Sequence, residues 1–170
     1  KSKKIDILIN NAGINKISSI DKININDVRN ILYINLEIPT LISSIVSKNM
    51  IKKKNGKIIN ISSIFGLVSK EKRSSYSSSK FGILGLTKSS ALDLASYNIL
   101  VNSISPGFID TKLTRKILKL SGMKKMSKVV PVKRLGKVKE IAYLSMFLAS
   151  SYNTYITGQN IVIDGGFTSK

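Results

Sequence analysis

The fold is decided by residues 57–107, which read KIINISSIFGLVSKEKRSSYSSSKFGILGLTKSSALDLASYNILVNSISPG. The two ends of this stretch, 57–62 and 99–104, are short runs rich in isoleucine and valine, typical of strands buried in a parallel sheet. Between them the pattern predicts a helix from about Tyr76 to Ala95, which Ser74-Ser75 can cap. Strand, helix and strand in this order predict a right-handed βαβ crossover.

The segments on either side continue the alternation of strands and helices. Strands are predicted at 5–9 and 160–164, and helices at 26–50 and 139–148. Residues 112–130 are polar, lysine-rich and poorly periodic, so we expect short mobile helices there. The whole pattern predicts an α/β fold: a doubly wound parallel sheet, covered by helices on both faces, within a single domain.

Small and polar residues follow each predicted strand. The strand ends carry Asn10–Gly13, Ser62-Ser63, Ser105–Gly107 and Asp164–Gly166. In open parallel sheets, ligands bind beyond the carboxyl ends of the strands. We therefore expect a ligand along this edge of the sheet.

The composition is strongly basic. Lysine and arginine total 28 against 9 acidic residues, a formal charge of +19. Only four of the basic residues are arginines, and the lysines are spread along the chain in short runs such as Lys52–Lys54. Arginine is the side chain that suits base readout and phosphate binding. This distribution favours solvated lysines over a specific nucleic-acid site, on a surface that can steer acidic partners or phosphorylated substrates.

Several chemistries are excluded by residue types that the 170 residues lack. The sequence has no cysteine and no histidine. Disulfides, thiolate zinc sites and iron–sulfur clusters are thereby excluded, we expect no metal site, and acid–base chemistry falls to Tyr, Lys, Ser, Asp or Glu. Neither a run of about 18 uncharged apolar residues nor a secretory leader is present, so we expect no membrane span and a cytoplasmic location.

Tyr76 and Lys80 are four residues apart on a predicted helix and therefore share one face. A free phenol has a pKa near 10, and we expect the ammonium one turn away to lower it. Tyr76 can then exchange a proton with a substrate oxygen near neutral pH. Taken alone, this spacing more often describes a partly exposed tyrosine beside a surface lysine.

Two further polar residues can complete such a site. Ser63 ends the strand before this helix, where its hydroxyl can hold a substrate oxygen; the alternative is a serine that caps a turn. Asn35 lies four residues before Pro39 in a predicted helix. Because proline has no N–H, the Asn35 carbonyl is released at a kink and can bind a water that connects Lys80 to solvent. The alternative is a plain proline kink.

Together these motifs resemble those of the short-chain dehydrogenase/reductase family, and most closely its 3-oxoacyl-[acyl-carrier-protein] reductase branch. Each motif is weak alone, but their order and spacing match over nearly the whole chain. The matching segments are Asn10–Gly13, Asn35, Ser63, Tyr76-x-x-x-Lys80, Ser105–Thr111, Pro131-x-x-Arg134-x-Gly136, Tyr155–Gly158 and Asp164–Gly166.

The resemblance implies a Rossmann-type NAD(P)-binding domain, of which residues 1–170 are the C-terminal part. Its activity would be hydride transfer between NAD(H) or NADP(H) and a carbonyl or secondary alcohol. Tyr76 would be the acid–base residue, and Lys80 would lower its pKa and hold the nicotinamide ribose. Ser63 would orient the carbonyl, and Asn35 would anchor the relay water. The implied cofactor-binding residues are Asn11, Gly13, Tyr76, Lys80, Pro106, Gly107, Ile109 and Thr111; for the two loops among them, the alternative is a structural turn.

The resemblance also implies partners. The substrate would be a 3-oxoacyl thioester on an acidic carrier protein, a sugar or another small ketone, with residues 112–130 as the lid that selects it. The family is usually tetrameric, so a homo-oligomer, a tetramer or a dimer, is expected.

The chain departs from the family pattern at its start. The family opens with a strand and a Thr-Gly-x-x-x-Gly-x-Gly loop, followed by a helix whose N-terminus binds the pyrophosphate, and the 170 residues contain no such loop. We therefore expect a fragment that is inactive alone, with an exposed apolar edge at 5–9. Two alternatives stay open: a non-enzymatic interaction subunit of the same fold, and a polyanion-binding module.

Overall fold

A parallel sheet lies at the centre of the computed structural model, which describes residues 5–169 apart from the side chains of 113 and 117. Its strands run in the order β1-β2-β3-β6 and every neighbouring pair is parallel, which confirms the predicted fold class. The strands are β1 (Ile7–Asn10), β2 (Gly56–Ile61), β3 (Ile99–Pro106) and β6 (Asn160–Ile163).

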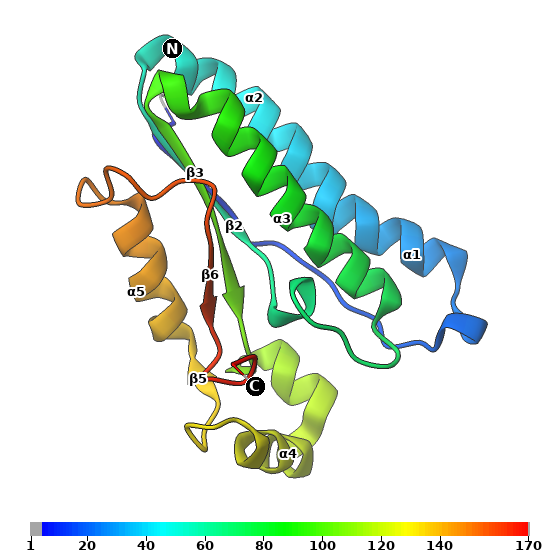
Figure 1. The fold of residues 1–170 in the computed structure, drawn as a ribbon. Coiled ribbons are helices and arrows are strands. Elements are labelled where there is room, and N and C mark those ends of the chain that lie inside the picture. The colour runs from blue at the N-terminus through cyan, green and yellow to red at the C-terminus, as the bar shows by residue number, and fades with distance from the viewer. Residues whose placement is uncertain (1–4, 170) are drawn as a thin grey trace.

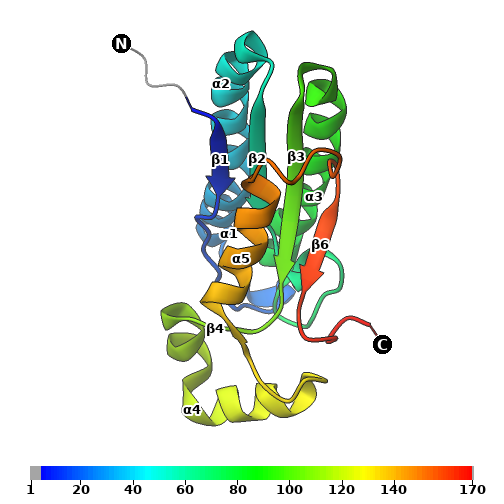
Figure 2. The ribbon, with the colours of Figure 1, turned by 90° about the vertical axis from the view of Figure 1, so that its left-hand side faces the viewer.

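Helices cover both faces of this sheet, as Figures 1 and 2 show. One face carries α1 (Ile25–Leu32), a π-helical segment (Tyr33–Glu37), α2 (Ile38–Lys53) and α3 (Ser74–Leu94). The other face carries α5 (Val138–Ala149), and α4 (Lys112–Val129) lies beyond the carboxyl ends of the strands. The shorter elements are the 3-10 turns Ile20–Lys22, Ile64–Gly66 and Ala95–Tyr97, and the two-residue strands β4 (Ile109–Asp110) and β5 (Gly136–Lys137).

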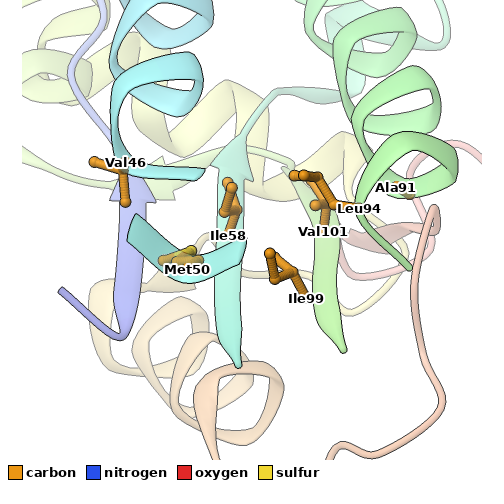
Figure 3. Packing of buried hydrophobic residues seen from close by; sticks show 7 residues of the cluster. All are labelled: Val46, Met50, Ile58, Ala91, Leu94, Ile99 and Val101. Carbon is orange, nitrogen blue, oxygen red and sulfur yellow. The ribbon is translucent and has the colours of Figure 1, made fainter. Parts of the chain in front are cut away.

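The core is divided by the sheet into two layers. Successive residues of a strand point to opposite faces, so Ile58 packs beneath α2 and α3 while Ile59 packs beneath α5 with Leu148. The first layer, drawn in Figure 3, consists of Val46, Met50, Ile58, Ala91, Leu94, Ile99 and Val101. Both layers fix the helices against the strands and so fix where the strand ends lie.

Buried amides align the strands near the site. Asn10 pairs in register with Asn60, and its Nδ2 donates to the Asn60 Oδ1 at 2.7 Å. The Asn60 Nδ2 in turn donates to the Thr87 hydroxyl of α3 at 2.9 Å. Because an unpaired buried amide is costly, this chain of bonds holds β1, β2 and α3 at one relative height.

The helix predicted at 26–50 is a continuous helical segment interrupted by a π-turn. The side chain of Asn24 accepts the Asn26 N–H at 2.8 Å, so the cap lies two residues before its predicted position. The N–H of Ile38 donates to the carbonyl of Tyr33, five residues earlier, immediately before Pro39. The predicted irregularity at this proline is confirmed, in the form of a π-bulge.

By length and composition alone, the segment Ile25–Lys53 is long and apolar enough to cross a membrane. The sequence-based expectation that no such segment exists is therefore wrong on that criterion. In the structure this segment packs on the sheet, since Val46 and Met50 are buried against β2 and Asn35 is buried among polar partners. It is thus a core helix of the sheet.

Three local features differ in how well the sequence predicted them. Ser74-Ser75 does not cap α3: the cap residue is Arg73, without a side-chain cap bond, and the buried Ser74 hydroxyl has no hydrogen-bond partner among the described residues. The expectation of short helices at 112–130 is confirmed, because α4 consists of two helical segments separated at Lys119, where φ is 52° and ψ is 178°. The β4–β5 pairing, Ile109 beside Gly136, was not predicted because two-residue strands leave no periodic pattern.

Candidate active site

The carboxyl ends of β1, β2 and β3 border a cavity of about 330 Å³. Its walls are the loop after β1, the end of β2, the first turns of α3 and the loop after β3. Nearly every predicted site residue lines it, namely Asn11, Gly13, Ser63, Tyr76, Lys80, Pro106, Gly107, Ile109 and Thr111. Asn35 does not line the cavity but lies directly beside Gly13. A cavity thus lies at the edge of the sheet where the sequence analysis expects a ligand.

Lys80 lies one turn after Tyr76 on α3, and its Nζ is 5.7 Å from the centroid of the Tyr76 ring. The lysine is only 4% exposed, and its Nζ donates to the carbonyl of Ile61 at 2.8 Å. A lysine ammonium has three donors, so two remain for a ligand at this position. Burial lowers the pKa of Lys80 to about 8.

The pKa of the Tyr76 phenol is determined mainly by the burial of the side chain. Its ring packs edge-on against Phe65 with the centroids 6.4 Å apart. Burial raises the pKa of Tyr76, and the Ser63 hydroxyl and the Arg73 charge oppose this rise without cancelling it. The prediction that Lys80 lowers the pKa of Tyr76 is therefore wrong. Burial has the largest effect and raises this pKa, and the cation that opposes the rise is Arg73. A phenol with a raised pKa keeps its proton at neutral pH, so the group that faces the cavity is the protonated phenol and not a phenolate.

Of the two roles considered for Ser63, the structure confirms the turn cap, and the binding of a substrate oxygen stays a prediction. Ser63 follows β2 directly and its Oγ accepts the N–H of Phe65 at 3.2 Å, so it does cap the following 3-10 turn. It also lines the cavity beside Tyr76. The neighbouring Ser62 donates its hydroxyl to the backbone carbonyl of Lys80 at 3.0 Å, which fixes the end of β2 against α3.

Asn35 joins the π-helical segment to the other walls of the site. Its side chain accepts the Ile14 N–H at 2.8 Å and donates to the Ile14 carbonyl at 2.9 Å and to the Ser79 hydroxyl at 3.1 Å. It is 1% exposed. The side chain therefore fixes the loop after β1 against α3, a role that the sequence did not predict, whereas the predicted water on its carbonyl stays a prediction.

The two predicted glycines have different reasons for being glycine. Gly13 does not adopt a positive φ, so its turn does not need glycine for its backbone. A Cβ there would lie 3.4 Å from the Asn35 Oδ1 and 3.6 Å from the Lys80 Nζ, in space that glycine leaves open. At Gly107 a Cβ would lie 2.7 Å from the Asp164 Cα, so this residue permits the close approach of the chain after β6, which confirms the structural alternative there.

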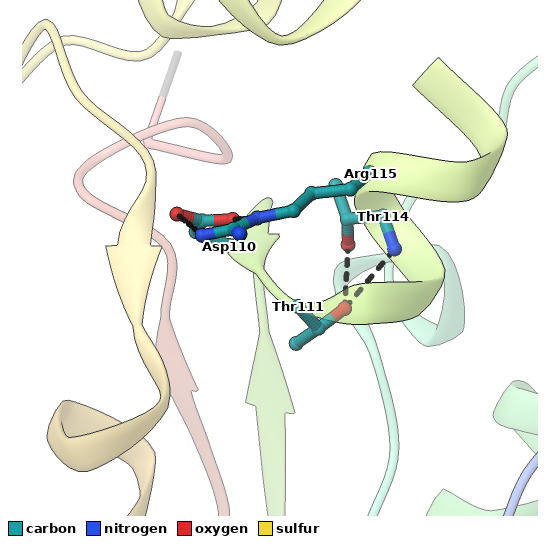
Figure 4. Close-up of polar contacts among 4 residues, drawn as sticks. All are labelled: Asp110, Thr111, Thr114 and Arg115. Carbon is teal, nitrogen blue, oxygen red and sulfur yellow. Dashed lines mark hydrogen bonds and ion pairs between the residues drawn. The ribbon is translucent and has the colours of Figure 1, made fainter. Parts of the chain in front are cut away.

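The segment after Gly107 closes the cavity from the side of α4. Ile109 belongs to β4, and the Thr111 hydroxyl caps α4 by accepting the Thr114 N–H at 3.1 Å (Figure 4). Arg115 binds Asp110 through two bonds of 2.7 and 3.0 Å, which hold the first turn of α4 to β4. Thr111 thus combines a structural cap with a place on the cavity wall.

Among the wall residues that sequence reasoning missed are Phe65, Phe108 and Arg73. The aromatic rings form an edge-to-face series with centroid distances of 6.3 Å from Phe65 to Phe108 and 5.2 Å from Phe108 to Phe167. A signal for Arg73 was available, because it is one of four arginines and stands three residues before Tyr76. That spacing places both residues at the start of one helix.

Comparisons with known proteins agree with this geometry. A family model described as "Enoyl-(Acyl carrier protein) reductase" matches residues 1–168. The 3-oxoacyl-[acyl-carrier-protein] reductase of Thermotoga maritima is 39% identical over 166 residues, covering 98% of this chain and 67% of that protein. The chain thus spans about two thirds of the length of this relative.

Solved structures of similar fold extend the comparison. A gluconate 5-dehydrogenase from Burkholderia cenocepacia J2315, in complex with NADP and tartrate, superposes with a TM-score of 0.96 at 32% identity, covering 100% of this chain and 67% of the other. A 4-hydroxyisoleucine dehydrogenase complexed with NADH superposes with a TM-score of 0.93 at 36% identity, covering 98% and 70%.

Proposed function

Because the chain belongs to the short-chain dehydrogenase/reductase family, we propose that the protein containing it transfers a hydride between NAD(P)H and a carbonyl or secondary alcohol. The activity is most like that of a 3-oxoacyl-[acyl-carrier-protein] reductase. One observation carries the proposal: Ser63, Tyr76 and Lys80 line one cavity, with the Lys80 ammonium 5.7 Å from the Tyr76 ring.

The residues of the cavity fit the nicotinamide end of NAD(H) or NADP(H). Lys80 keeps two N–H donors for ribose hydroxyls, and Gly13 leaves the space beside its Nζ open. Asn11, Ile109 and Thr111 border the same space and would hold the nicotinamide. When bound, the cofactor supplies the hydride, and the protein positions the substrate and supplies the proton. The similar structures with NADP and with NADH support either form.

The protein side of the reaction is a proton transfer. Ser63 and Tyr76 would bind the carbonyl oxygen together, and Tyr76, protonated because burial raises its pKa, would donate its proton as the carbon is reduced. The product is an alcohol, and the phenolate left on Tyr76 would be stabilised by the nearby cations of Lys80 and Arg73. General acid catalysis of this kind contributes about 10²- to 10⁴-fold. A water on the Asn35 carbonyl would return the proton through Lys80.

A 3-oxoacyl thioester on a carrier protein is the substrate that we favour. The similarity to the Thermotoga reductase at 39% identity supports it, as does a basic surface that would attract an acidic carrier, including the exposed Lys52 and Lys54. A sugar or another small ketone is the second candidate, and the gluconate 5-dehydrogenase structure favours it at 32% identity. In either case α4, broken at Lys119 and contributing Leu118 to the cavity, would act as the selecting lid.

We also propose a homo-oligomer, a tetramer or a dimer, in the cytoplasm. Large apolar side chains are exposed on the outer helices, with Leu41 and Ile45 on α2 and Phe81 and Leu92 on α3, and Leu92 is 83% exposed. Large apolar side chains exposed on neighbouring helices are the kind of surface that a partner subunit would cover. A chain without cysteine is compatible with a reducing compartment.

The 170 residues by themselves would be inactive. They contain no glycine-rich loop for the pyrophosphate, and the edge strand β1 exposes Ile7 and Ile9. A non-enzymatic subunit of the same fold is the alternative to an active enzyme. A glycine-rich loop encoded before Lys1 would support the enzyme, and a start codon directly before Lys1 would support the subunit.

The substrate proposal is tested by following NADPH and NADH oxidation with the protein that contains this chain. We expect turnover of a 3-oxoacyl carrier-protein thioester with a kcat/KM at least tenfold above that of a keto-sugar acid. The reverse order would favour the sugar alternative, and no turnover of any carbonyl with either cofactor would contradict the proposed function.

A further inference from the structure

Arg73 has an unsatisfied guanidinium on the wall of the catalytic cavity. Among the described residues, none accepts a hydrogen bond from it and none forms an ion pair with it, and its Nη1 is buried. Tyr76 and Glu71 are the two groups whose negative charge would favour the Arg73 cation, and Glu71 is exposed and lies 3.6 Å from the Lys70 Nζ. A buried N–H without a partner is costly, so an acceptor brought by a ligand would stabilise this site.

The guanidinium is held close to the reacting groups by an aromatic platform. Its Cζ lies 5.6 Å from the centroid of the Phe65 ring, in cation–π geometry. The same ring packs against Tyr76 with the centroids 6.4 Å apart. Phe65 therefore keeps the guanidinium of Arg73 and the phenol of Tyr76 side by side, although no described residue forms a hydrogen bond with that guanidinium.

We propose that Arg73 is a specificity-determining residue that binds a second oxygen of the substrate, on the carbon two positions from the reacting carbonyl. Tyr76 and Ser63 hold the reacting oxygen, and Arg73 donates to the other. This inference rests on the proposed function and deepens it, because it names the substrate class as a carbonyl compound that carries a further acceptor oxygen nearby.

Two classes of substrate carry a second acceptor oxygen at that position. In a 3-oxoacyl thioester it is the neutral carbonyl of the thioester, and in a 3-oxo acid it is a carboxylate. The planar fork of arginine suits both, and a charge-assisted bond to a carboxylate would be the stronger one. A simple ketone has no such oxygen and leaves the guanidinium unsatisfied.

The test compares three substrates in the protein that contains this chain: an acetoacetyl thioester, acetoacetate and 2-butanone. We expect Arg73→Met to lower kcat/KM about 10- to 100-fold more for the compounds with a second oxygen than for 2-butanone, mainly through KM, because the loss with 2-butanone reports only the cation that is missing beside Tyr76. If kcat/KM falls more for acetoacetate than for the thioester, the group that Arg73 binds in the native substrate is a carboxylate. If it falls more for the thioester, that group is the thioester carbonyl.

Two further variants separate recognition from folding and charge. Arg73→Lys keeps a cation beside Tyr76, so the pH profile with 2-butanone should be retained, while the loss of the fork should still lower kcat/KM for the thioester. Arg29→Met removes an exposed arginine of α1 and should change none of these values.

The outcomes distinguish the two levels of the proposal. If Arg73→Met lowers kcat/KM equally for all three substrates, or for none of them, Arg73 does not determine specificity, even though the enzyme is active. If the unmodified protein reduces none of the three substrates, the proposed function itself fails, and the role of Arg73 fails with it.

Discussion

The inner and outer walls of the cavity differ in how fully their polar groups are paired. Ser62 and Lys80 on the inner wall, and Asn35 and Ser79 directly behind it, are all buried, and each side chain has a hydrogen-bond partner. On the outer wall, where the loop after β1 meets the start of α3, the Oδ1 of Asn15 and the Nη1 of Arg73 are buried without partners among the described residues.

This difference separates fixed chemistry from adjustable recognition. Groups whose hydrogen bonds are all made within the protein are held in one geometry, and proton transfer needs such a fixed geometry. Groups that lack partners leave interactions to be made by a ligand, and substitutions among them change which ligand fits. The inner wall should therefore respond to mutation through catalysis and stability, and the outer wall through substrate preference.

The largest effect is expected on the inner wall at Lys80. Lys80→Met removes the ammonium that would hold the ribose and stabilise the Tyr76 phenolate, and we expect kcat/KM to fall at least about 100-fold. Lys88→Met, an exposed lysine two turns later on α3, is the matched control and should retain full activity. Equal activities of the two variants would remove Lys80 from the mechanism.

The pH dependence of cofactor binding follows from the same residue. The pKa of Lys80 is lowered from 10.5 to about 8 by burial, so the ammonium is lost as the pH rises through about 8. Affinity for NAD(P)H, measured by fluorescence titration, should weaken above that pH. The folded state binds this proton less tightly than the unfolded state, so stability should rise with pH between about 8 and 10.5. Both trends should vanish in Lys80→Met.

A pair of asparagines tests the contrast through stability. Asn35→Ala removes three hydrogen bonds and leaves the backbone groups of Ile14 without partners, so we expect a loss of about 2–3 kcal/mol in the free energy of unfolding. Asn15→Ala removes an oxygen that has no partner and should cost less than about 0.5 kcal/mol. Equal losses in urea unfolding would mean that the two walls are equally well bonded.

The smallest effect is expected at the ion pair beside β5. Glu140 accepts from Arg134 at 2.7 and 2.9 Å and from the Lys137 N–H at 2.6 Å, and these bonds lower its pKa from 4.5 to about 2. Its contribution to stability is present above pH 4.5 and is lost as the pH falls toward 2. The melting temperature of the natural protein should fall slightly more steeply as the pH is lowered than that of Glu140→Gln. Identical pH dependences would mean that ionised Glu140 does not stabilise the fold.

The sheet and the strand ends were predictable because they depend on short-range patterns. The apolar runs at 57–62 and 99–104 correspond to β2 and β3, and the helix between them to α3. The helix spacing of Tyr76 and Lys80 also held, and the pair lies on one wall of the cavity. Periodicity encodes these features within a few residues along the chain.

Features that depend on tertiary environment were not predictable. The pKa of Tyr76 rises because Phe65 and the surrounding fold bury the ring, which a helical spacing cannot reveal. The bonds from Asn35 to Ile14 and Ser79 join residues 21 and 44 positions apart. The buried Nη1 of Arg73 has no hydrogen-bond acceptor among the described residues, and the sequence cannot reveal this because it depends on which groups surround Arg73 in the fold.

A single-turnover measurement on Tyr76→Phe tests the inner wall most directly. The variant keeps the ring against Phe65 and lacks only the proton that would reach the carbonyl oxygen. The proposed mechanism predicts an unchanged dissociation constant for NAD(P)H and a hydride-transfer rate about 10²- to 10⁴-fold slower than that of the natural protein. Hydride transfer at the natural rate would show that Tyr76 is not the proton donor.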